Sequence, residues 1–117
     1  MSNVGDSILA ENANWNFDGD IANNFESHVK KSVPLYEKGH ELVLESADYF
    51  VKDESICYEL GCSTGILSYK LSNRFKKINA NFVGLDQVEN MISFAKNKYQ
   101  NKNLKYECAD VIDYEFL

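Results

Sequence analysis

Two spacings of apolar residues divide the chain from residue 55 onward. Short apolar runs at 55–60, 81–85 and 104–108 alternate with segments at 65–75 and 88–99, in which apolar residues recur every three or four positions. The short runs predict strands, and the longer segments predict amphipathic helices. Strands that alternate with helices are typical of a parallel α/β sheet. Right-handed crossovers would then gather the loops that follow the strands at one edge of this sheet.

The first 20 residues show neither the strand spacing nor the helix spacing of apolar residues. Residues 1–14 are polar and rich in Ser, Asn and small residues, which predicts a disordered N-terminus. Residues 15–20 have the composition of a turn, and Asp18 or Asp20 is well placed to cap a helix over 21–30.

A proline separates this helix from a second one. Pro34 cannot continue the first helix but suits a first helical turn, and an apolar helical stripe follows it over 35–50. We therefore expect residues 15–54 to form an N-terminal helical segment and residues 55–117 to form the sheet domain.

Composition limits the function classes. The chain has 117 residues, of which 44% are hydrophobic, and this fits one globular domain. The net charge of −6 argues against direct nucleic-acid binding through phosphate contacts. No apolar run approaches the roughly 20 residues of a membrane span. The three cysteines have no metal-ligand spacing, so we expect no metal site; with no signal peptide, they indicate a reducing cytoplasm.

The turn after the first predicted strand begins and ends with glycine. Gly61 leaves no side chain between the backbone and a ligand, and Gly65 permits close approach of helix and strand. The spacing is GxxxG, with Ser63 where the GxGxxG dinucleotide fingerprint would place its middle glycine. A looser glycine loop preceded by an acid suits a cation-bearing ligand better than a pyrophosphate.

Carboxylates stand at the ends of the first two predicted strands. Glu59 could orient the loop or meet an amino group, or it could be an ordinary strand-end carboxylate. Asp86 could accept both hydroxyls of a ribose. Taken alone, it could equally cap the helix that starts at Val88, but the glycine loop 21 residues before it favours ribose binding.

A third acid follows the third predicted strand. Asp110 could reach an adenine amine, with the amide of Val111 beside it; Asp113 and Glu115 nearby favour the alternative of a simple acidic loop. We find no nucleophile with a credible base partner, so the catalytic residues stay unknown.

From about Trp15 onward, the residues resemble a class I S-adenosylmethionine-dependent methyltransferase. A narrower match consists of Phe17-Asp18 with the helix after it, the stretch 31–36 and the glycine loop 60–65. Together these resemble the carboxy-S-adenosylmethionine synthase family. Its members make the carboxymethyl donor for the wobble uridine of tRNA from S-adenosylmethionine and prephenate.

The resemblance implies a fold, a cofactor and a set of contacts. The fold would be the N-terminal portion of a Rossmann-like α/β methyltransferase domain, with residues 15–54 as a cofactor lid. In that family the tyrosine after Ser-Val-Pro reaches over the bound cofactor, so Tyr36 is a candidate contact; the alternative is a core aromatic. The remaining implied S-adenosylmethionine contacts are Glu59, Gly61, Cys62, Ser63 and Gly65 around the methionine portion, Asp86 and Gln87 at the ribose, and Asp110 and Val111 at the adenine.

Two departures from the family pattern matter. Glu59 stands where the family usually has aspartate. The chain also ends at Leu117, soon after the third predicted strand, whereas a class I sheet has seven strands with the first paired to the fourth. We therefore expect a truncated fold, with the first strand as an exposed apolar edge that leads to self-association or to pairing with a complementary fragment.

The resemblance leaves the reaction open. Ordinary one-carbon transfer and synthesis of the carboxylated donor both fit, and the acceptor stays unknown. A non-catalytic interaction module that retains a methyltransferase half-fold is the alternative. A dinucleotide-binding oxidoreductase fragment is a third, which Ser63 disfavours because it interrupts the tight glycine turn.

Overall fold

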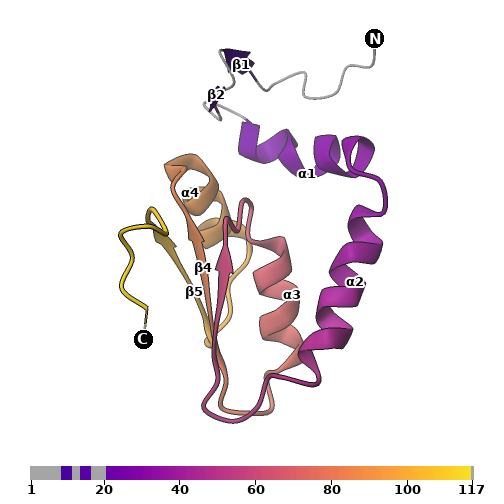
Figure 1. Ribbon diagram of the computed structural model, residues 1–117, viewed down its shortest axis with the longest axis vertical. Helices are drawn as coiled ribbons and strands as arrows, with labels where there is room; N and C mark the ends of the chain where they lie inside the picture. Colours follow the sequence, from indigo (N-terminus) through magenta and orange to yellow (C-terminus); the bar gives the residue numbers. More distant parts are fainter. Residues whose placement is uncertain (1–8, 12–13, 17–20, 117) are drawn as a thin grey trace.

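The computed structural model describes residues 9–11, 14–16 and 21–116, with side chains described from residue 24 (Figure 1). Its centre is a sheet of three parallel strands in the order β3 (Ile56–Leu60), β4 (Asn81–Asp86) and β5 (Leu104–Cys108). Tyr58 lies opposite Val83, and Gly84 lies opposite Tyr106. The parallel sheet and its strand positions agree with the sequence predictions to within a residue.

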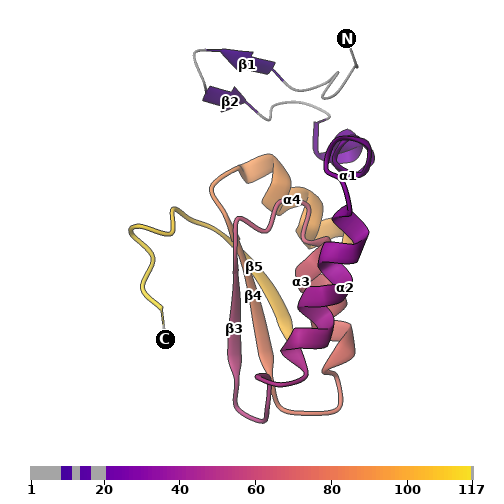
Figure 2. The same cartoon turned by 45° about the vertical axis from the view of Figure 1, so that its right-hand side comes forward.

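The helices beside the sheet are gathered on one of its faces. α2 (Tyr36–Ala47), α3 (Ile66–Arg74) and α4 (Glu89–Lys98) stand on the same side of the strands (Figure 2). α1 (Ile21–Ser32) lies across the end of the sheet toward which the strands point. Among the described residues, none of the helices has the length and apolar character that a membrane crossing requires.

The core fills the space between these helices and the sheet. One cluster joins the glycine loop to α4 and β5, and its buried members are Cys62, Ile92, Ala95, Tyr99 and Tyr106. A smaller cluster places Phe25 of α1 against Met91 of α4. The hydrophobic stripe of α1 therefore fixes this helix over the first turns of α4, as burial of apolar surface favours.

Residues 109–116 form no strand and turn back over the opposite face of the sheet. The ring centroids of Tyr114 and Phe116 lie 5.9 and 4.8 Å from that of Tyr58 on β3. This tail thus contacts the face that the helices leave uncovered, and β3 remains an outer strand of the three-stranded sheet.

Two short strands are described in the N-terminal region, where the sequence predicts disorder over residues 1–14. β1 (Leu9–Glu11) pairs with β2 (Asn14–Asn16) in an antiparallel ladder. Strands of three residues are too short for a two-residue period of apolar positions to show in the sequence. The proposed helix caps, Asp18 and Asp20, lie outside the described residues.

Candidate functional site

The glycine loop has three residues in the left-handed backbone region. Gly61 has φ +73°, Gly65 has φ +87°, and Ser63, which carries a side chain, has φ +52°. A Cβ added at Gly61 would meet no atom within 4 Å, so space is open beside the backbone there. A Cβ at Gly65 would come within 2.7 Å of Cε1 of Tyr106 and within 2.8 Å of Cβ of Ala95. Gly65 thus permits close packing, and Gly61 opens the loop.

Asp86 ties this loop to the start of α4. Its Oδ2 accepts a hydrogen bond from the backbone N–H of Ser63 at 2.9 Å, and its Oδ1 accepts one from the N–H of Val88, also at 2.9 Å. The second bond matches the capping interpretation of this residue, because α4 begins at the next residue after Val88. Each carboxylate oxygen can accept a further bond, so both interpretations of Asp86 are compatible with its geometry.

Glu59 lies under the same loop, on the helix side of β3. Its Oε1 accepts hydrogen bonds from the backbone N–H of Ser68 at 3.1 Å and from Oγ of Ser68 at 2.5 Å. The pKa of the Glu59 carboxyl is raised to about 7, chiefly by burial and also by the negative charge of Asp86, against the lowering effect of the hydrogen bonds from Ser68. Glu59 thus fixes the first turn of α3 relative to β3, with a carboxyl that titrates near neutrality.

A cavity of about 400 Å³ opens where the three strands end. Of the predicted site residues, five line it: Gly61, Asp86, Gln87, Asp110 and Val111. Sequence reasoning missed its apolar lining, which comprises Leu60, Leu85, Val88 and Ala109. The available signal was position, because each of these residues lies within two places of a predicted site residue at a strand end.

Two predicted residues lie behind the cavity wall. The thiol of Cys62 is buried in the core, where burial raises its pKa to about 12, an effect strengthened by Glu59 and Asp86. Gly65 is buried as well, and its N–H donates to the carbonyl of Cys62 at 2.9 Å. Ser63 is partly buried beside them.

Tyr36 approaches from the helices. It is the first residue of α2, is partly buried, and has its ring centroid 4.4 Å from that of His40. Burial raises the pKa of its phenol, and the carboxylates of Glu26 and Glu59 raise it further. Two acidic side chains, one from α1 and one from β3, therefore contribute to the electrostatic environment of Tyr36.

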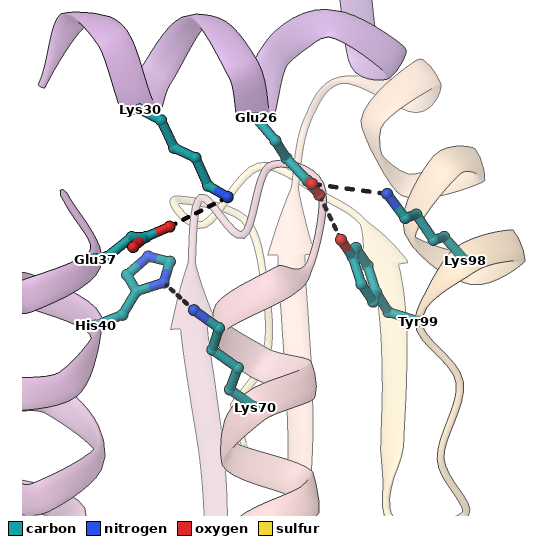
Figure 3. A network of polar contacts seen from close by, with 7 residues as sticks. All are labelled: Glu26, Lys30, Glu37, His40, Lys70, Lys98 and Tyr99. Atoms are coloured by element: carbon teal, nitrogen blue, oxygen red, sulfur yellow. Dashed lines mark hydrogen bonds and ion pairs between the residues drawn. The ribbon is translucent and has the colours of Figure 1, made fainter.

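A network of polar contacts joins the four helices α1 to α4 (Figure 3). Glu26 of α1 accepts a hydrogen bond from the Tyr99 hydroxyl at 2.6 Å and lies 3.7 Å from Nζ of Lys98. Lys30 and Glu37 pair at 3.2 Å between α1 and α2. His40 and Lys70 approach to 3.2 Å, where burial and the Lys70 charge lower the pKa of the imidazole. Sequence reasoning named none of these partners.

The described part of the chain has no set of side chains that could ligate a metal ion. No group of three or more His, Cys, Asp and Glu side chains there could hold a metal ion. The three cysteines are free thiols. The groups that gather at the strand ends are carboxylates and backbone amides, which suit hydroxyl, amino and amide groups of an organic ligand.

Comparison with known proteins identifies relatives of two kinds. The chain is 38% identical over 103 residues to carboxy-S-adenosyl-L-methionine synthase of Staphylococcus epidermidis and 31% identical over 105 residues to that of Ruthia magnifica. The first match covers 87% of this chain and 45% of the relative, and the second covers 88% and 44%. The chain thus spans less than half the length of these curated relatives.

Solved structures share the fold at low sequence identity. The plantazolicin methyltransferase BpumL, in complex with a pentazolic desmethylPZN analog and SAH, matches with a TM-score of 0.59 and 18% identity over 85% of this chain and 38% of its own. A TehB-like SAM-dependent methyltransferase from Corynebacterium glutamicum matches with a TM-score of 0.54 and 17% identity over 80% and 47%. These likenesses confirm the expected Rossmann-like methyltransferase architecture for the part of the fold that is described.

The family model of the methyltransferase domain matches residues 58–117, which is half of the chain and includes the glycine loop and the three strand-end acids Glu59, Asp86 and Asp110. The matched region begins within β3 and runs through the cavity at the strand ends. The chain belongs to the methyltransferase domain family.

Proposed function

We propose that this chain binds S-adenosylmethionine in the cavity at the ends of β3, β4 and β5, as the cofactor-binding part of a cytoplasmic enzyme related to the carboxy-S-adenosylmethionine synthases. The observation that carries the proposal is the composition of that cavity. It has a volume of about 400 Å³, and Gly61, Asp86 and Asp110 line it together.

The chemistry of the lining fits the proposed ligand. The space beside Gly61 admits a ligand against bare backbone. Asp86 retains acceptor capacity for ribose hydroxyls, and Leu60, Val88 and Val111 provide the apolar surface that an adenine ring prefers. Glu59, partly buried under the loop, would attract the amino group of the methionine portion when ionised.

The cofactor would supply the reactive group, and the chain would supply its position. S-adenosylmethionine carries an already activated sulfonium, so the protein's contribution is to bind, orient and shield it. The relatives named carboxy-S-adenosyl-L-methionine synthase favour formation of the carboxylated donor for tRNA modification over ordinary methyl transfer. No residue is assigned to the acceptor, because the residues that line the cavity are all used for contacts with the cofactor.

Calorimetric titration of the purified chain tests the proposal. We expect S-adenosylmethionine and S-adenosylhomocysteine to bind, NADH to give no heat, and Asp86→Ala to abolish the binding. Asp113→Asn is the control, since it removes a negative charge from an exposed residue that does not line the cavity. Binding of NADH alone, or no adenosyl binding by the folded chain, would overturn the proposal.

We also propose that β3 accepts a strand from a second copy of the chain or from a complementary fragment. β3 is an outer strand, and its residues Ile56 and Leu60 are 43% and 58% exposed. Exposed apolar residues on an outer strand favour pairing with another chain. This same surface is what a non-catalytic interaction module would use.

A further inference from the structure

We infer that Glu26 is a positioning residue, which fixes α1 on α4 and thereby sets the position of Tyr36 at the start of α2. The inference rests on the proposed cofactor site, because Tyr36 matters there as a candidate contact. It concerns a residue outside the glycine loop and outside the cavity lining.

The contacts of Glu26 connect two distant parts of the chain. Its carboxylate accepts a hydrogen bond at 2.6 Å from the hydroxyl of Tyr99, which lies 73 positions further along the chain (Figure 3). Nζ of Lys98 lies 3.7 Å from the same carboxylate. The Glu26 side chain is 18% exposed, so solvent screens this interaction far less than it screens a surface pair.

Tyr99 carries the connection inward to the loop. It is buried in the core cluster with Tyr106. The Tyr106 hydroxyl donates to the carbonyl of Tyr99 at 2.9 Å and lies 3.4 Å from the carbonyl oxygen of Gly65. A continuous series of polar contacts therefore runs from α1 through two tyrosines to the underside of the glycine loop.

Glu26 also acts on the opposite side, toward α2. Its charge is the first carboxylate influence on the Tyr36 phenol, ahead of Glu59. The Glu26 carboxylate thus accepts a hydrogen bond from Tyr99 and, after burial, contributes to raising the pKa of the Tyr36 phenol. Beyond α1 the chain reaches Tyr36 through Leu35, whose φ of 60° is unusual for a residue with a side chain. An anchor on α1 fixes the start of that short connection.

The neighbouring pair of Lys30 and Glu37 provides a matched comparison. It joins α1 to α2 at 3.2 Å, but its side chains are 49% and 65% exposed. A surface ion pair contributes little to position or stability. Removing the Glu37 carboxylate therefore controls for loss of one negative charge beside α1, and it leaves the contact between α1 and α4 intact.

Affinity for S-adenosylhomocysteine tests the inference in the full chain. We expect Glu26→Ala to weaken binding about tenfold. Glu26→Gln should keep most of the affinity, because its carboxamide oxygen can still accept a hydrogen bond from the Tyr99 hydroxyl. Glu37→Ala should bind like the unmodified chain. In a Tyr36→Ala background, the further change Glu26→Ala should have almost no effect, since the effect passes through Tyr36. Additive losses in the two backgrounds would overturn the inference.

A second measurement needs no ligand. In protein with 13C-labelled tyrosine rings, the Tyr36 signal is identified by its absence from Tyr36→Ala. Glu26→Ala should shift that signal and lower the pKa of the phenol, because the anchor of α1 and a negative charge are both removed, whereas Glu41→Ala, at an exposed position of α2, should do neither. An unmoved Tyr36 signal overturns the inference even where the chain binds the ligand. Absence of ligand binding overturns the proposed function, and the ring signals still decide the role of Glu26.

Discussion

The Tyr106 ring lies against Gly65, so closely that a Cβ on residue 65 would come within 2.7 Å of Cε1 and 2.8 Å of the hydroxyl oxygen. Tyr106 is buried and its hydroxyl donates to the carbonyl of Tyr99, so the ring cannot move aside freely. The glycine loop is thus seated on a fixed aromatic ring, and the two glycines of the loop have different tasks.

Alanine at each glycine separates these tasks. Gly65→Ala should destabilise the fold by about 2–4 kcal/mol, through steric overlap added to an unfavourable positive φ. Gly61→Ala meets open space and should cost only about 1 kcal/mol, but its Cβ would enter the cavity and weaken adenosyl-ligand binding. Urea unfolding and calorimetry measure the two effects. Equal losses of stability would contradict the assignment.

Asp86 should matter for the fold even in the absence of ligand. Asp86→Asn keeps one oxygen acceptor but turns an NH₂ group toward either the Ser63 or the Val88 amide. The free energy of unfolding should fall by about 1–2 kcal/mol. Asp113→Asn makes the same charge change at an exposed position and should stay within about 0.5 kcal/mol of the unmodified chain. An unchanged midpoint of urea unfolding in Asp86→Asn would show that the glycine loop does not depend on the Asp86 carboxylate.

Glu59 should make stability depend on pH. Its pKa rises from 4.5 to about 7 on folding, so the folded state binds a proton more tightly than the unfolded state. The stabilising effect is complete below pH 4.5 and is lost as pH rises through 7, amounting to about 3 kcal/mol at roughly 1.4 kcal/mol per pKa unit.

Glu59→Gln identifies this contribution. The carboxamide oxygen can still accept the two Ser68 hydrogen bonds, so the variant should be more stable than the unmodified chain at pH 8 and should lose the slope between pH 4.5 and 7. Urea unfolding at several pH values measures both. A slope that persists in Glu59→Gln would assign the pH dependence to other groups.

The outer position of β3 predicts concentration-dependent association. Ile56→Lys would place a charge on that strand and should shift the chain toward monomer in sedimentation velocity, because lysine on an outer strand opposes strand pairing. Val33→Lys, at a similarly exposed position between α1 and α2, should leave the distribution unchanged. A monomer at all concentrations of the unmodified chain would remove this proposal.

Local patterns were enough to predict the sheet and the loop. The period of apolar residues placed β5 at Leu104–Cys108 and β4 within one residue. The position of the strand-end acids at one edge of the sheet was expected, because parallel strands present their carboxyl ends at the same edge. Both predictions depend on residues close together in the sequence.

What sequence could not predict depends on packing between distant segments. Nothing in the spacing pairs Glu26 with Tyr99, which lies 73 residues away. Leu35 has a left-handed backbone conformation, which sequence reasoning expects at glycine and therefore could not predict at a leucine. The burial of Gly65 against Tyr106 arises only once β5 and α3 are packed. Contacts of this kind are decided by tertiary structure, whereas local propensity leaves them open.

The central position of β4 has a consequence for exchange with solvent. β4 is hydrogen-bonded to β3 on one side and to β5 on the other, and its residues from Phe82 to Leu85 are buried. Amide protons there can exchange with deuterium only when the whole domain opens, whereas those of an outer strand or a helix end escape through local fluctuations. The deuterium uptake of β4 therefore reports the global stability of the domain, and it offers a single internal gauge against which every substitution can be compared.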